Sequence, residues 1–262
     1  MFAGYFEADD RDGTEYGRAA SLAHGMCGAL TGLPTSAAAG SPIDMVDQAF
    51  PGAPIAPSTL LRNAMDHTLL DLGHVMGIVE QSGRQVSVPA IMGNIRTSLL
   101  SASHLCYAIS PADARQRLHH IGELYDLEMR SAAKFVKEVD KQDPSVLPGL
   151  RPPPDAAVRQ LASYANPYPP AQRVTESLLL GHMKEQVLGP LLTQLKIDES
   201  HAALLVDHMF NTTSGAAHGY SWIDLEGVIC HFVAHFTYAV SVANLVFNDY
   251  LRALGRHPTR SA

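Results

Sequence analysis

The sequence predicts an all-α protein: a helical bundle of about five to seven helices, with an amino-terminal arm and a proline-rich crossover. Apolar residues recur at the three- and four-residue spacing of a helix over several long segments. No Asn-Gly or Asp-Gly pair lies between alternating apolar residues, as a β-hairpin would need. Most of the periodic segments start or stop at a capping residue or a proline. Together these observations favour helices joined by short connections.

The first 57 residues are predicted to form an arm or cap. They begin with an acidic run and contain a candidate helix from Tyr16 to Leu30 and a short one from Pro42 to Phe50. A loop rich in Gly, Ala, Ser and Pro separates the two. Residues 58–262 are expected to form the bundle domain, because a chain of 262 residues can bury most of its apolar surface in a single core.

Three long helices are predicted at the start of the bundle. The first covers about 58–81, since Ser58 is a good N-cap and apolar residues follow at helical spacing. The second covers 87–109 and ends at the pair Ser110-Pro111, because proline disrupts a helix interior. The third begins at Pro111, which suits a first turn, and continues to about residue 141.

A proline-rich crossover is predicted at about 143–170. Prolines cluster at 144–154 and again at 167–170. Each proline lacks an amide donor and restricts the residue before it, so a continuous helix cannot form there. Further helices are predicted after the crossover, at about 175–187, 190–195, 200–217 and 225–254.

The last predicted helix resembles a membrane span only in part. Between Glu226 and Asp249 it has no charged residue and is about long enough to cross a bilayer. It also carries His231 and His235, which are costly in lipid, so we expect no membrane span. Three scattered cysteines and the lack of a signal-peptide pattern favour a reducing, cytoplasmic location.

Arg62, Asn63 and His67 form the most informative short motif. Positions five apart lie about 140° apart around a helix, so Arg62 and His67 can flank one phosphate. His67 can then act as general base toward a ribose 2′-hydroxyl, while Arg62 stabilises the charged phosphorane. The motif resembles the R-x4-H signature of the all-helical HEPN superfamily (higher eukaryotes and prokaryotes nucleotide-binding). The resemblance implies an RNA-binding protein or metal-independent endoribonuclease that needs no cofactor and forms a homodimer, with one cleft between paired helices.

Basic residues are too few to make the whole surface attractive to nucleic acid. The net charge is −7, so DNA binding is not expected and RNA binding must depend on a local patch. Arg115 and Arg117 supply such a patch and are the predicted substrate-binding residues. The R-x4-H spacing also occurs at Arg115 with His120 and at Arg252 with His257, so the spacing alone has low specificity.

The segment from Phe210 to Gly219 carries a second resemblance. It is similar to the Y-R-x-x-S-G-x-x-H-G segment of a group of helical bacterial proteins, whose Arg and His are again HEPN-like. The resemblance implies that His218 belongs to the catalytic site. Asn211 occupies the arginine position and lacks a guanidinium, so we expect weakened catalysis. The same residues are also compatible with a helix closed by Gly219 as a left-handed cap.

Two sets of histidines leave a metal-dependent helical-bundle enzyme as an alternative. His67, Asp71 and His74 lie at i, i+4 and i+7 on one helix, and His231 and His235 lie at i and i+4 on another. Such ligands suit a transition metal such as zinc or iron, although no H-E-x-x-H sequence accompanies them. A third interpretation is a non-catalytic helical module that binds a partner chain.

Overall fold

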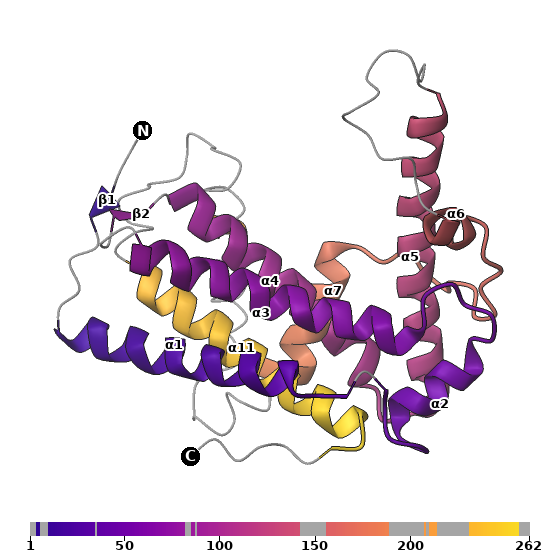
Figure 1. Cartoon of the computed structure of the whole chain (residues 1–262), viewed down its shortest axis with the longest axis horizontal. Helices are drawn as coiled ribbons and strands as arrows, with labels where there is room; N and C mark the ends of the chain where they lie inside the picture. The colour runs from indigo at the N-terminus through magenta and orange to yellow at the C-terminus, as the bar shows by residue number, and fades with distance from the viewer. Residues whose placement is uncertain are drawn as a thin grey trace.

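The computed structural model describes residues 4–5, 10–34, 36–81, 85–86, 88–141, 156–188, 207, 210–213 and 231–256. Within these ranges the regular structure is helical, apart from one short antiparallel pairing of β1 (Gly4–Tyr5) with β2 (Gln85–Val86). The prediction of an all-α helical bundle is confirmed (Figure 1). The described helices are α1 (Asp10–Thr31), α2 (Pro42–Ala49), α3 (Pro57–Gln81), α4 (Val88–Ile109), α5 (Ala114–Asp140), α6 (Ala156–Ala162), α7 (Glu176–Met183), the π-helical turn η1 (Lys184–Leu188) and α11 (Phe232–Ala253).

Capping side chains explain where several of these helices begin. The Ser41 hydroxyl accepts a hydrogen bond from the Asp44 amide and caps α2. The Asp47 carboxylate accepts from the Ser58 amide at 2.7 Å, which satisfies a free donor at the start of α3. α5 begins at Ala114 rather than at Pro111, because Asp113 is its N-cap. The predicted ends of α3 at 81 and of α4 at 109 agree with the structure.

The core lies where α1, α3, α4 and α11 pack together. α3 packs along α4, and α11 lies against both α1 and α4 (Figure 1). Burying a large apolar side chain contributes about 1.5–3 kcal/mol, so this region supplies much of the stability of the fold. Fully or almost fully buried members include Ala23, Leu61, Met65, Leu72, Val75, Ile91, Ile95, Leu105, Phe236, Val240 and Ala243.

The residues predicted to form an amino-terminal arm or cap contribute to this core. α1 starts at Asp10, earlier than the predicted Tyr16, and acidic residues are favoured in the first turn of a helix. Its residues Ala19, Ala23 and Met26 are buried, and α2 packs against α3 and α5. The two helices therefore cover the bundle directly rather than standing apart from it.

α5 lies across one end of the bundle, with α6 beside it (Figure 1). The second half of the crossover, residues 163–175, is held on α5 by polar contacts. Asn166 Nδ2 donates to the Gly122 carbonyl at 2.7 Å, and the Tyr168 backbone lies directly over Gly122. The Glu123 carboxylate accepts from the amides of Ala171 and Gln172 at 3.2 and 3.3 Å. Residues 143–155, the first half of the crossover predicted at 143–170, lie outside the described residues.

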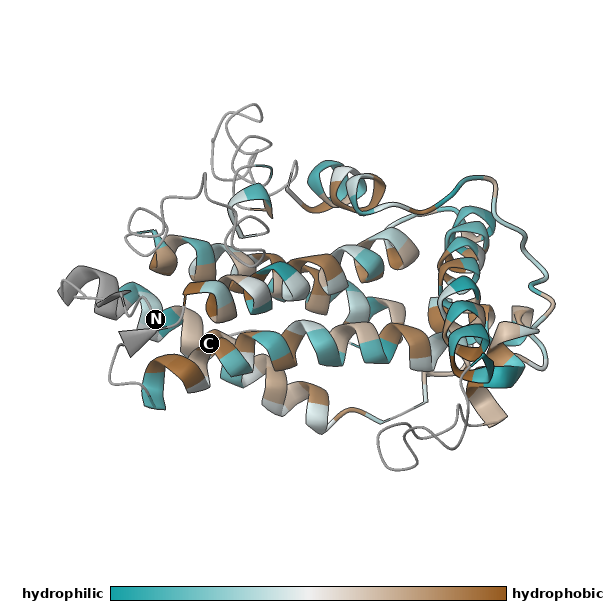
Figure 2. Ribbon diagram, turned by 90° about the horizontal axis from the view of Figure 1, so that it is seen from above, coloured by the Kyte–Doolittle hydropathy of each residue, from teal (hydrophilic) through white to brown (hydrophobic). Residues whose placement is uncertain are grey.

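Hydrophobic and hydrophilic residues alternate along the long helices, as expected of amphipathic helices (Figure 2). Among the helices in the described ranges, none is both long and apolar enough to cross a bilayer. This includes α11, which covers much of the segment predicted at 225–254 and whose buried face packs on the core.

Candidate functional site

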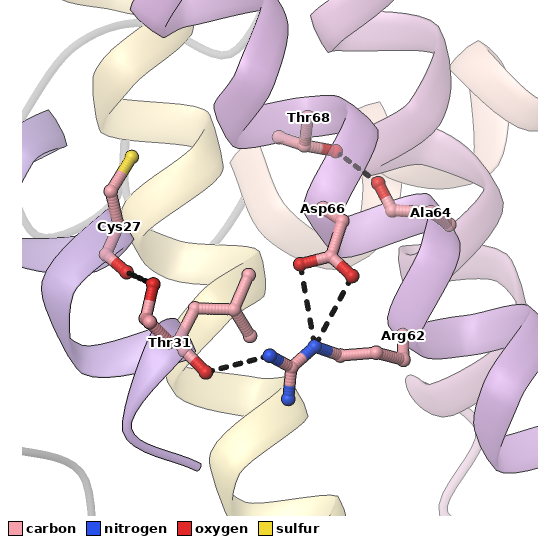
Figure 3. A network of polar contacts seen from close by, with 7 residues as sticks. Cys27, Thr31, Arg62, Ala64, Asp66 and Thr68 are labelled. Atoms are coloured by element: carbon pink, nitrogen blue, oxygen red, sulfur yellow. Dashed lines mark hydrogen bonds and ion pairs between the residues drawn. The ribbon is translucent and has the colours of Figure 1, made fainter. Parts of the chain in front are cut away.

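Arg62 is held by contacts with α1 and with Asp66 of its own helix, α3 (Figure 3). Its Nη2 atom donates to the Leu30 carbonyl at 2.7 Å, and its Nε atom lies 3.3 Å from both oxygens of Asp66. The Leu30 carbonyl is one of the last in α1 and accepts from the Leu33 amide at 3.1 Å as well as from Arg62, so Arg62 helps to cap α1 from α3. Arg62 also opposes the effect of burial on Tyr250 of α11, whose pKa is raised to about 12. Its charge is thus already balanced by an acid and a carbonyl.

The other α3 residues of the predicted motifs lie on its outer face. Asn63, His67 and His74 are exposed, and Asp71 is half-buried. Burial raises the pKa of Asp71, and the neighbouring His67 and His74 oppose that shift. His67 therefore interacts with Asp71, while the guanidinium of Arg62 is directed to the end of α1.

The proposed metal ligands do not come together in the part of the chain that the structure describes. No group of three or more His, Cys, Asp and Glu side chains in those ranges is arranged to hold an ion. His231 is exposed at the start of α11, whereas His235 is buried within the helix packing. The metal alternative gains no support from this arrangement.

The second predicted motif is described only at its beginning. Phe210 lies under the guanidinium of Arg96, with 4.9 Å between the arginine carbon and the ring centre. Asn211 is exposed and Thr213 is buried. His218 lies outside the described residues, so its place in a site stays a prediction.

The predicted substrate-binding residues lie in the first turn of α5. The Asp113 carboxylate accepts from the amides of Arg115 and Gln116 at 2.6 and 3.0 Å, which fixes this turn. The Arg115 side chain is exposed. Arg117 is half-buried, and its Nη1 atom donates to the carbonyls of Pro111 and Ala112 at 2.6 and 3.0 Å. Arg115 is therefore open to solvent, while Arg117 stabilises the connection from α4.

His120 lies about one helical turn further along α5, and its side chain contacts the end of α4. Its Nδ1 atom lies 2.7 Å from the Tyr107 carbonyl, and its ring stacks on the Tyr107 ring at 3.9 Å with an interplanar angle of 1°. A carbonyl can only accept, so Nδ1 carries the hydrogen in this contact. In the neutral ring, Nε2 is then the nitrogen that can accept a proton.

A second imidazole, from α7, lies against the first. The ring of His182 is 5.5 Å from that of His120 and 5.1 Å from that of Tyr107, edge-on to both. Its Nε2 atom lies 2.7 Å from the Ser110 hydroxyl. Burial and the nearby His120 lower the pKa of His182, and Glu185 opposes this, so the ring is neutral at pH 7.

A buried polar network supports these two rings. The Tyr107 hydroxyl donates to the Glu123 carboxylate and accepts from Gln172 Nε2 at 3.3 Å. Burial and the bond to Glu123 raise the pKa of Tyr107, so it remains protonated. Glu123 is only 3% exposed, and its other oxygen accepts from the crossover amides. The network fixes the Tyr107 ring on which both histidines rest.

We call Tyr107, Ser110, His120 and His182 the corner site, because they meet where α4, α5 and α7 come together. Sequence reasoning singled out the nearby arginines but not Ser110 or His182, which are 72 residues apart. The R-x4-H spacing of Arg115 with His120 was the one signal that pointed here. Nothing local in the sequence indicates that His182 joins it.

Comparison with known proteins gives no match to this chain. No family model matches it, and neither a curated protein nor a solved structure is similar enough to inform its function.

Proposed function

We propose that this protein binds RNA and cleaves it by metal-independent, HEPN-like acid–base chemistry, with Arg115 and His120 as the arginine–histidine pair. The observation that carries the proposal is the hydrogen bond from His120 Nδ1 to the Tyr107 carbonyl. It orients the ring and leaves Nε2 to take a proton from a ribose 2′-hydroxyl.

Arg115 supplies the positive charge that the reaction needs. Its side chain is exposed and lies in the first turn of α5, so a phosphate can reach it from solvent. A guanidinium can bind two phosphate oxygens at once and stabilise the charge of the phosphorane. Because the chain as a whole carries a charge of −7, such a local contact favours a few phosphates of RNA over long tracts of duplex DNA.

The Arg62, Asn63 and His67 motif is the competing position for the same chemistry. Its spacing is identical, but Arg62 already binds the Leu30 carbonyl and Asp66. A phosphate would have to displace these contacts, which makes the motif the weaker choice. His218, if it joins either site, would add a further imidazole.

The proposal includes a homodimer in the cytoplasm. The HEPN resemblance implies a homodimer. We assign its contact to the outer face of α3 rather than to α5, because Leu70 on the α3 face that carries Asn63 and His67 is 53% exposed. A dimer formed through this face would remove the Leu70 side chain from water, which is favourable. The scattered cysteines favour a reducing compartment.

The test compares the two arginine–histidine pairs directly. Cleavage of single-stranded RNA would be measured in the presence of a chelator for the native protein, His120→Asn, Arg115→Ala and His67→Ala. Asparagine keeps a donor to the Tyr107 carbonyl while removing the base, so His120→Asn tests chemistry rather than folding. We expect a rate loss of about 100-fold or more in His120→Asn and Arg115→Ala, and a near-native rate in His67→Ala.

Two other outcomes carry different conclusions. Loss of cleavage in His67→Ala alone would assign the chemistry to the α3 motif. A native protein that neither binds nor cleaves RNA would overturn the proposed function and favour the interaction module.

A further inference from the structure

We propose that Ser110 and His182 form a second reactive pair, a hydroxyl nucleophile with its general base, which attacks carboxylic esters that have good leaving groups. This activity goes beyond the proposed RNA function. It needs neither the free nitrogen of His120 nor the charge of Arg115.

The distance between the Ser110 oxygen and the His182 nitrogen is the one expected of a nucleophile and its general base. Ser110 Oγ lies 2.7 Å from His182 Nε2, within the range of about 2.6–3.2 Å that such pairs show. Contacts of this length also tie helices together, so the distance alone does not distinguish a reactive pair from a structural one. The backbone and the surroundings of the two residues make the distinction.

The backbone holds the hydroxyl in place. Ser110 is the first residue after α4, and its amide donates to the Cys106 carbonyl at 3.0 Å. Pro111 follows and is buried, and a residue before proline is restricted to extended conformations. Ser110 is half-buried, so the residue is partly open to solvent.

The position of the His182 ring is also fixed by its neighbours. The ring of His182 packs edge-on against Tyr107 at 5.1 Å, with an interplanar angle of 80°. α7 ends at Met183 and passes directly into the π-helical turn η1. Such turns are rare in helices and frequently occur at functional sites.

The groups around the pair act on His182 in opposite directions: burial and His120 disfavour the protonated ring, and Glu185 favours it. His120 of α5, Glu185 of η1 and Cys106 of α4 are the titratable groups that act on the pair. His182 is neutral at pH 7 because burial and His120 lower its pKa, while Glu185 opposes them. Burial, together with Asp249 of α11, raises the pKa of Cys106 to about 12, while a hydrogen bond with the Ser110 side chain opposes this shift. The thiol therefore stays protonated and does not compete as a nucleophile.

The step conserves atoms and charge. Ser110 Oγ forms a bond to the acyl carbon, its proton passes to His182 Nε2, and the alcohol leaves with its electron pair and takes that proton. Water then hydrolyses the acyl-serine through the same base. Among the described contacts, no carboxylate hydrogen bond orients His182. Without such a carboxylate, the pair is expected to cleave phenyl-type esters more readily than amides. The leaving group of a phenyl-type ester needs less protonation by the histidine.

A fluorophosphonate probe tests the pair in the full-length native protein. The Ser110 oxygen would bond to phosphorus as fluoride leaves, and the adduct can be located by peptide mass spectrometry. We expect labelling at Ser110 in the folded protein, no label in Ser110→Ala and labelling at least about 100-fold slower in His182→Gln. Ser163→Ala is the matched control, because Ser163 donates to the carbonyls of Arg159 and Gln160 and not to an imidazole.

Each remaining outcome would overturn the proposal. The first is a native protein without an adduct on Ser110. The second is labelling of the urea-denatured protein that equals labelling of the folded protein. The third is a folded His182→Gln variant that is labelled as fast as the native protein. Circular dichroism establishes folding, and mapping the adduct on the native chain keeps the test valid if a variant unfolds. The labelling reaction uses no RNA, so its failure would not contradict the proposed RNA function. Likewise, a protein that does not cleave RNA would not contradict the Ser110–His182 pair.

Discussion

Gly122 and Glu123 are consecutive residues of α5 that hold the crossover on the bundle. Three of residues 167–170 are prolines, which have no amide hydrogen to donate. The amides of Ala171 and Gln172, which follow them, are free and need an acceptor. Glu123 provides it, and its second oxygen binds the Tyr107 hydroxyl beneath the corner site. A buried carboxylate is stable only when its oxygens are satisfied in this way.

Gly122→Ala should destabilise the protein. A Cβ there would lie 2.3 Å from the Tyr168 carbonyl oxygen, a backbone atom that cannot move without displacing the crossover. We expect a loss of about 1–3 kcal/mol in the free energy of unfolding, measured by urea denaturation.

Gly73→Ala is the matched control, because its Cβ would meet no atom within 4 Å. Alanine is the better helix former, so this variant should be stabilised by about 0.5–1 kcal/mol. Equal effects of the two substitutions would contradict the close packing of Tyr168 on Gly122.

At the scale of the elements, Arg62 joins α3 to the end of α1. The guanidinium satisfies the Leu30 carbonyl, which lies 32 residues away in the chain, and pairs with Asp66 on its own helix. Its side chain is 21% exposed, so the carbonyl contact is sheltered from solvent in large part. The packing of α1 on the bundle therefore depends partly on this residue.

Arg62→Met should lower the free energy of unfolding by about 1–2 kcal/mol, because it removes the charged hydrogen bond to the Leu30 carbonyl and leaves that carbonyl only the Leu33 amide. Arg252→Met is the matched control, since Arg252 pairs with Asp249 at a largely exposed position, 61% for Arg252. Exposed ion pairs contribute only about 0–1 kcal/mol. Guanidinium titrations of both variants, followed by circular dichroism, make the comparison. A smaller effect at Arg62 than at Arg252 would contradict its role as a cap.

At the scale of the whole molecule, the outer face of α3 is the expected dimer contact. Leu70 is exposed at 53% and lies between His67 and His74. Leu70→Asp should weaken a dimer formed through this face, because it places a charge at an apolar contact. Sedimentation equilibrium should give twice the chain mass of 28.2 kDa for the native protein and a lower average mass for the variant.

Phe135→Asp provides the control for that measurement. Phe135 is similarly exposed, at 48%, but belongs to α5. We expect this variant to keep the native mass. A native protein that sediments as a monomer at every concentration would rule out the homodimer.

The sequence alone determined the helical class and the bounds of two long helices. Ser58, the pair Ser110-Pro111 and the apolar residues at helical spacing between them predicted α3 and α4 to within a residue or so, whereas α1 begins six residues before its predicted start. These signals work because helix formation and capping depend on contacts within about four residues. The same logic identified three R-x4-H pairs, Arg62 with His67, Arg115 with His120 and Arg252 with His257.

Only the tertiary structure decided which partners the side chains of those pairs contact. Arg62 is occupied by Leu30 from another helix, and His120 is oriented by Tyr107 and accompanied by His182 from α7. No spacing in the sequence indicates these partners, since Ser110 and His182 are 72 residues apart. Side chains from distant segments meet only after the apolar faces of the helices have packed, and that packing fixes which nitrogen is free to accept a proton.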